Sequence, residues 1–169
     1  MPPIDQIDRR TDVVFILFYF QNTIQGVTKL QKLLFLIEQE TEFFEEYKED
    51  IAFNFAPYKM GPFSEHVYQE LQFLLQLEAI EAEPLEQSSQ PVVGDSELTN
   101  KAFTLTSKGE KIATELVGIL DEEYQDELEG LVDTYGPMPL DKLLEEVYHS
   151  YPAYTEESEI KDEVFAKGD

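Results

Sequence analysis

The chain has 169 residues, of which 42% are apolar, so it can bury a core. It contains no cysteine, which excludes disulfides, thiolate metal sites and cysteine catalysis. Its 36 acidic residues against 12 lysines and arginines give a net charge of -24, which disfavours nucleic acid and anionic membranes as partners. The cysteine-free composition fits a cytoplasmic protein, and the N-terminal sequence does not have the pattern of a secretory signal.

The first two predicted elements are buried helices. Residues 12–22 are apolar through their middle, which predicts a buried helix with Thr11 or Asp12 as its N-cap. Residues 27–40 carry an apolar stripe at helical spacing, which predicts a second helix. That stripe consists of Val27, Leu30, Leu33, Leu34 and Ile37.

The polar residues of the second helix have their own expected places. Thr28 and Gln31 have the spacing of a T-x-x-Q capping box. Lys29 and Lys32 fall outside the apolar stripe, so we expect them on the solvent face. The acidic stretch 41–50 is expected to form a solvated helix end and loop.

A short strand, a turn and a third helix follow. Residues 51–56 alternate large and small side chains, which predicts a strand. Gly61 and Pro62 predict a turn. Ser64 is the expected N-cap of a helix that runs to about Ala79. Its polar side carries Gln69, Gln72 and Gln76.

Two further strands are predicted to form a hairpin. Residues 80–85 and 101–106 have strand character, and the polar stretch 86–100 between them predicts a long loop. Ser107 and Glu110 have the S-x-x-E spacing of a capping box, which predicts that a fourth helix begins there.

The last 49 residues of the 169 are expected to be helical and acidic. A break is predicted at Tyr135–Pro137, with Pro139 in the first turn of the next helix. Residues 140–148 carry an apolar stripe, which is a candidate interface for a homodimer. A last short helix is predicted over 155–164.

This order of elements predicts a mainly α (α+β) fold with a winged helix-turn-helix core, a small β-hairpin wing and a C-terminal helical extension. The winged-helix domain would cover residues 1–120, and the acidic extension residues 121–169. In a winged helix, the third helix enters the major groove of DNA. The stretch FTLTSKG, residues 103–109, resembles the wing strand of many winged-helix regulators.

Two further stretches carry a more specific resemblance. KLQKLLFLIE (29–38) and FAPYKMGPFSEHVYQELQFL (55–74) resemble the SocA-like Panacea antitoxin domains and related prokaryotic or phage proteins. These proteins pair K-L-x-K-L-x-x-L with Y-x-x-G-P-[FV]-S and V-Y-x-x-L. The resemblance covers residues 12–110 and, more loosely, 151–160. It implies a domain that works through proteins, either neutralising a toxin or delivering one to a protease. The partner-binding candidates are Lys29, Lys32, Tyr58, Lys59, Gly61, Pro62, Phe63 and Ser64.

The charge of the predicted reading surface argues against DNA. Residues 60–100 contain no lysine or arginine and eight carboxylates, whereas phosphate contacts normally use cations. The alternative, a winged-helix transcriptional regulator, rests on side chains that can contact DNA, since glutamine can pair with adenine edges. Its DNA-reading candidates are Gln69, Gln72, Gln76, Lys101 and Lys108, with Lys111 beside the last two.

No residue pattern specifies a reaction. Glu146 and His149 form a single E-x-x-H pair, whereas a di-iron bundle needs two pairs and two further glutamates. Ser64 and His66 are too close along one helix to face each other. We therefore expect no catalytic site, cofactor or metal, and a protein partner that is a toxin or another basic protein. The acidic excess has three possible explanations: adaptation to high salt, mimicry of DNA phosphates, or a docking surface for a basic partner.

Overall fold

Helices make up most of the part of the chain that the computed structural model describes, which is residues 7–58, 61–84 and 101–154. Two small antiparallel sheets complete it, so the fold is mainly α with a minor β component. The α-helices of this part are α1 Arg10–Gln21, α2 Val27–Glu40, α3 Glu42–Ile51, α4 Glu65–Gln76, α5 Ser107–Gly118, α6 Glu122–Tyr135 and α7 Leu140–Ser150. The strands are β1 Thr23–Gln25, β2 Ala56–Tyr58, β3 Gly61–Phe63, β4 Ile80–Pro84 and β5 Lys101–Leu105, and a 3-10 helix spans Pro152–Tyr154.

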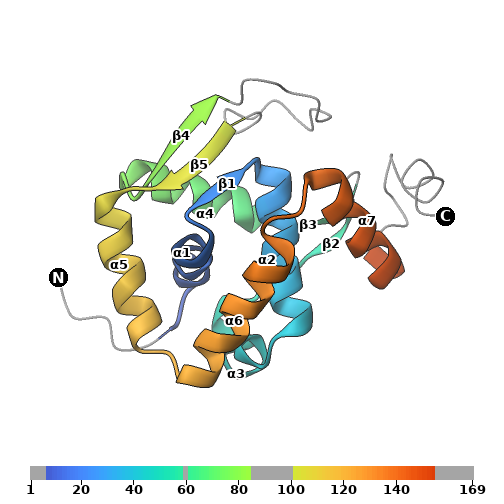
Figure 1. Cartoon of the computed structure of the whole chain (residues 1–169), viewed down its shortest axis with the longest axis horizontal. Coiled ribbons are helices and arrows are strands. Elements are labelled where there is room, and N and C mark those ends of the chain that lie inside the picture. The colour runs from blue at the N-terminus through green and yellow to red at the C-terminus, as the bar shows by residue number, and fades with distance from the viewer. Residues whose placement is uncertain (1–6, 59–60, 85–100, 155–169) are drawn as a thin grey trace.

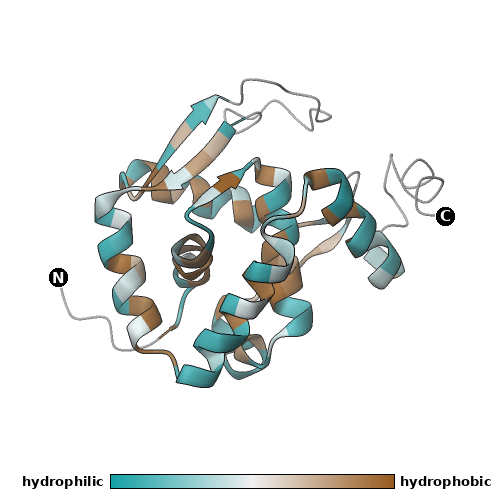
Figure 2. Cartoon of the chain, in the orientation of Figure 1, coloured by the Kyte–Doolittle hydropathy of each residue, from teal (hydrophilic) through white to brown (hydrophobic). Residues whose placement is uncertain are grey.

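Helix α1 forms the centre of the core. Its residues 13–18 are all buried, as expected of a helix that is apolar all round. Figure 1 views α1 end-on among the other helices, and Figure 2 shows its apolar colouring. The predicted helix is confirmed, but the predicted N-cap is wrong. Arg9 is the N-cap residue, and the Asp12 carboxylate accepts the backbone N–H groups of Asp8 and Arg9 at 3.1 Å each.

Helix α2 has the predicted bounds, whereas the next two predictions are wrong. The acidic stretch expected to be a solvated helix end and loop forms a separate helix, α3, because two groups satisfy the free N–H groups of its first turn. The Thr41 hydroxyl accepts from Phe44 N at 3.1 Å. The Glu127 carboxylate of α6 accepts from Glu42 N at 2.8 Å and from Phe43 N at 3.0 Å.

The predicted strand over 51–56 is also wrong in its bounds. Ile51 ends α3, and only Ala56 of the predicted range belongs to a strand. Strand β2 pairs with β3 in a hairpin, in which Ala56 lies opposite Phe63. The alternation of large residues that suggested a strand reflects core burial instead, since Ile51 and Phe53 are each only 1% exposed.

The main sheet has the strand order β1-β5-β4 and is antiparallel throughout. The predicted hairpin strands are confirmed as β4 and β5, with Ile80 opposite Leu105. Strand β1, which the sequence did not predict, pairs with the other edge of β5 and places Ile24 opposite Phe103. Both of these side chains are fully buried. The predicted loop 86–100 lies outside the described residues.

The later helices form where the sequence predicted them, with shifted caps. The N-cap of α5 is Thr106, whose hydroxyl accepts from Gly109 N at 3.1 Å, so the predicted Ser107–Glu110 box is wrong by one residue. Helix α6 ends at Tyr135, at the predicted break, and Pro139 precedes the first turn of α7. The predicted helix over 155–164 lies outside the described residues.

The apolar stripe of α7 is not a free surface. It packs against α2 and β3, and its members Leu143, Leu144, Val147 and Tyr148 are at most 4% exposed. This face is therefore buried in the chain's own core and cannot be the predicted dimer interface. Helices α6 and α7 contribute to the same hydrophobic cluster as α1 and α2. None of the described helices is long and apolar enough to cross a membrane.

Gly109 marks a close approach between α5 and the segment that leads into β4. A Cβ atom there would lie 2.0 Å from the Ala79 carbonyl oxygen, a backbone atom that cannot move aside. We therefore expect Gly109→Ala to lower the free energy of unfolding by about 1–3 kcal/mol in chemical denaturation. The control is Gly130→Ala in α6, where nothing lies within 4 Å and helix propensity predicts a gain of roughly 0.5–1 kcal/mol. Equal effects of the two changes would contradict this packing.

Candidate functional site

Helix α4 begins at a serine that is tied to α2. Ser64 is the predicted N-cap, and its hydroxyl accepts from His66 N at 3.2 Å. The same hydroxyl donates to the Phe53 carbonyl at 2.5 Å. The Gln31 side-chain amide exchanges two hydrogen bonds with the Ser64 backbone, both of 3.0 Å. The predicted Thr28–Gln31 capping box is therefore wrong, because this amide binds a distant segment instead of the start of its own helix.

The two lysines expected on the solvent face of α2 are buried. Lys32 is 2% exposed, and its ammonium group donates to the Pro62 carbonyl at 2.9 Å. Lys29 is 9% exposed and donates to the carbonyls of Gly136 and Met138 at 2.6 and 3.0 Å. Their predicted exposure is wrong because α2 is covered on both sides, by α7 and β3 and by α3 and α6. Both side chains hold backbone rather than offering charge to a partner.

Burial changes the protonation of these groups. Removal from water lowers the pKa of Lys29 and lowers that of Lys32 to about 7. On the same helix, burial raises the pKa of Glu38 to about 7, although its carboxylate accepts from Phe53 N at 2.8 Å. Gln31, Lys32 and Glu38 together hold the segment from Phe53 to Ser64 onto α2.

The hairpin between α3 and α4 carries the remaining partner-binding candidates. Tyr58 and Gly61 lie opposite each other in the β2–β3 pair. Phe63 is half-buried, and its ring centre lies 5.6 Å from that of Tyr68 on α4. Lys59 lies outside the described residues. Of these candidates, the buried Ser64 and the carbonyl of Pro62 thus serve to place α4.

The outer side of α4 carries a row of uncharged side chains, preceded by the exposed Glu65 four residues before Gln69. Its inner side is fully buried by Val67, Leu71 and Leu74. The outer row, spaced i, i+3, i+4, i+7, is exposed and consists of Gln69, Gln72, Phe73 and Gln76. The three glutamines lie together as the sequence predicted. Phe73 was not singled out in the sequence, although an aromatic residue in a row of glutamines is a visible signal.

The lysines proposed for DNA contact differ in how exposed they are. Lys101 is half-buried on β5, whereas Lys108 and Lys111 are exposed in the first turns of α5. No lysine or arginine occurs on α4 or β4, and Glu81 and Glu83 of β4 are exposed. Lys101 therefore lies in the hairpin, Lys108 and Lys111 follow it on α5, and none of the three lies on the helix that would read DNA.

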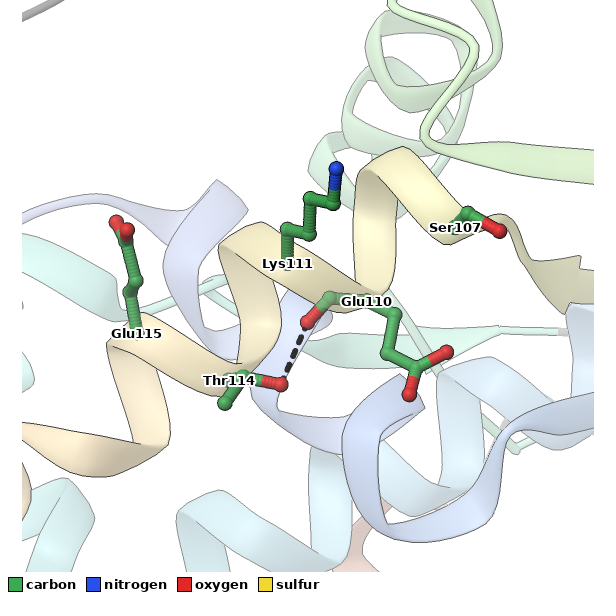
Figure 3. A pocket seen from close by; sticks show the side chains of 5 residues that line it. All are labelled: Ser107, Glu110, Lys111, Thr114 and Glu115. Atoms are coloured by element: carbon green, nitrogen blue, oxygen red, sulfur yellow. Dashed lines mark hydrogen bonds between the residues drawn. The ribbon is translucent and has the colours of Figure 1, made fainter.

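A shallow depression on the surface of α5 lies beside Lys111. It is lined by Ser107, Glu110, Lys111, Thr114 and Glu115, all from one helix. The charged side chains diverge, and the Thr114 hydroxyl donates to the Glu110 carbonyl at 2.7 Å (Figure 3). A surface built from one helix encloses no substrate. Within residues 7–58, 61–84 and 101–154, no group of three or more metal-ligating side chains is placed to hold a metal.

Comparison with known proteins assigns the chain to no family. No protein-family model matches the chain, and no curated protein matches it in sequence. The candidate site therefore rests on the geometry of α4 and of the side chains from α2 that hold it.

The buried charge of Lys32 makes a testable contribution to stability. Its pKa is about 7 in the folded chain and about 10.4 when unfolded, so between these values the unfolded chain binds more protons. Stability should therefore rise from pH 7 to pH 10, by at most about 1.4 kcal/mol per pH unit from this group. In Lys32→Met this part of the rise disappears, as measured by denaturation at each pH. The exposed Lys48→Met should keep the wild-type slope, and a slope unchanged in Lys32→Met would contradict the burial.

Proposed function

We propose that this chain is a non-enzymatic protein-interaction module of antitoxin or adaptor type, built on a winged-helix scaffold. The connectivity supports the scaffold. Helix α1 precedes β1, α2 follows it, and α4 leads into the β4–β5 hairpin, with β5 between the other two strands. Helix α3 and the β2–β3 hairpin then form an insertion between the second and third helices of the motif. On this reading the first strand of the motif is β1 and not residues 51–56.

The observation that carries the proposal is the charge of α4. On a winged-helix scaffold α4 and the wing would face DNA. Helix α4 and strand β4 carry no cation, whereas Glu65, Glu81 and Glu83 are exposed there. A surface without cations releases no counterions from phosphate, which removes most of the non-specific affinity for DNA. The overall charge of -24 adds repulsion.

The family resemblance supports a protein partner. Its two sequence blocks, KLQK and GPFS, are in contact through the bonds from Lys32 to Pro62 and between Gln31 and Ser64. The motif thus fixes the position at which α4 leaves the core. A motif that positions an uncharged helix face suits a docking scaffold, and a toxin or other basic protein would complement the acidic surface around it.

The first test is fluorescence polarisation with a pool of duplexes from upstream of the gene, at low and then physiological salt. We expect no binding at either. The control is a triple variant, Gln69→Lys, Gln72→Lys and Gln76→Lys, which places cations on the outer row and should gain salt-sensitive binding. Sequence-dependent binding by the wild-type chain at physiological salt would overturn the proposal. Recovery of the native chain from its own cells without a stoichiometric protein partner would also count against it.

A second candidate is a winged-helix transcriptional regulator. The observation that favours it is the exposure of Gln69, Gln72 and Gln76 in one row, with Lys108 and Lys111 exposed on α5. This function requires that the triple change of these glutamines to alanine abolish specific binding to the operator, because each lost bidentate pair costs about 1–3 kcal/mol. Unchanged binding in that variant would remove this candidate.

A further inference from the structure

The outer row of α4 has the composition of the centre of a protein interface. Phe73 is 41% exposed, and Tyr19 of α1, at 40%, is the other large apolar side chain that is comparably exposed among the described residues. Around Phe73 the row offers three uncharged amides, from Gln69, Gln72 and Gln76. Interface centres are depleted in charge and enriched in aromatic anchors.

Other exposed helix faces of the chain differ from this one. The exposed positions of α3 are five carboxylates and a lysine: Glu42, Glu45, Glu46, Lys48, Glu49 and Asp50. Five of the exposed positions of α6 are carboxylates: Glu122, Glu123, Asp126, Glu129 and Asp133. In a chain this acidic, an uncharged row four residues long is the exception that needs a physical reason.

The surroundings of the row indicate the chemistry of its occupant. Glu65 lies at the start of α4, Glu78 follows its end, and Glu81 begins the exposed part of β4. Glu70 accepts a hydrogen bond from the Thr11 hydroxyl, so it is tied to α1. A second copy of the chain would bring carboxylates against carboxylates, whereas a basic partner would pair with them.

The geometry points to the outer row of α4 as the binding surface for a basic, amphipathic helical segment of a partner protein, with Phe73 as the apolar anchor. This inference rests on the proposed protein-binding function and locates it. The partner's apolar side chains cover Phe73, and its lysines or arginines meet the carboxylates around the row. In docking of this kind the amphipathic helix of the partner presents its own apolar anchors at i, i+3, i+4 and i+7.

The test measures binding of three labelled synthetic peptides to the full chain by fluorescence anisotropy. They are an amphipathic leucine–lysine helix, a leucine–glutamate helix of the same pattern, and oligolysine. We expect the leucine–lysine helix to bind more tightly than the other two. Phe73→Ser should raise its Kd by roughly tenfold or more. The matched control is Tyr19→Ser, which removes an equally exposed aromatic ring from α1 and should leave the Kd unchanged.

A second variant guards against misfolding of the first. Gln72→Lys alters an exposed side chain only and places a cation against the peptide's lysines, so it should also raise the Kd. Hydrogen exchange of the complex should slow in residues 65–76. Equal loss with Tyr19→Ser, equal affinity for oligolysine, or a dimer that Phe73→Ser dissociates would each overturn the inference.

The two proposals fail in different ways. If the leucine–lysine helix binds, but neither α4 variant weakens it and protection falls outside residues 65–76, the docking site is wrong while protein binding stands. If the wild-type chain binds operator DNA at physiological salt and Gln72→Lys strengthens that binding, the proposed function itself is wrong.

Discussion

Three neighbouring polar side chains on a buried helix fix how the parts of this chain are joined. Gln31 and Lys32 of α2 hold the backbone of Ser64 and Pro62, immediately before α4. Lys29 holds the carbonyls of Gly136 and Met138, between α6 and α7. Removing Gln31 or Lys32 would take away the hydrogen bond to the buried Ser64 N–H or the Pro62 carbonyl, which costs more than the bond itself gains. The direction in which α4 leaves the core depends on these bonds.

Burying the ammonium groups of the two lysines costs free energy. Hydrogen bonds to backbone carbonyls, rather than ion pairs with carboxylates, offset this cost. Burial lowers the pKa of Lys32 to about 7, so near neutral pH the group is close to losing its proton. Glu38, two turns after Gln31 along α2, is shifted in the opposite direction to about 7. The same bonds that place α4 therefore make its base sensitive to protonation.

The carboxylates of the chain are distributed unevenly over its surface. Carboxylates cover α3 and α6, and one of them, Glu127, also caps α3 by accepting two backbone N–H groups. Glu40 accepts the hydroxyls of Tyr135 and Tyr151, which ties the ends of α6 and α7 to α2. Burial, together with the hydrogen bond to Glu40, raises the pKa of Tyr135 to about 12. Part of the acidic excess thus has a structural use. The outer row of α4 is left neutral, which sets it apart as the surface with different chemistry.

The sequence by itself determined most of the described helices and the β4–β5 hairpin, because these depend on local patterns, although it missed α3. The apolar stripe of residues 27–40 matched α2 to the residue, Ser64 capped α4 as expected, and β4 and β5 lay where alternation placed them. Only the tertiary structure decided the role of the polar residues between these patterns. Lys29 and Lys32 looked like solvent-facing residues, and Gln31 like part of a local capping box, because helical periodicity describes one helix and not what covers its far side. Strand β1, the cap from Glu127 and the burial of the α7 stripe likewise depend on partners far away in sequence. The local sequence pattern shows which residues can be buried, whereas contacts between distant segments decide which of them are buried.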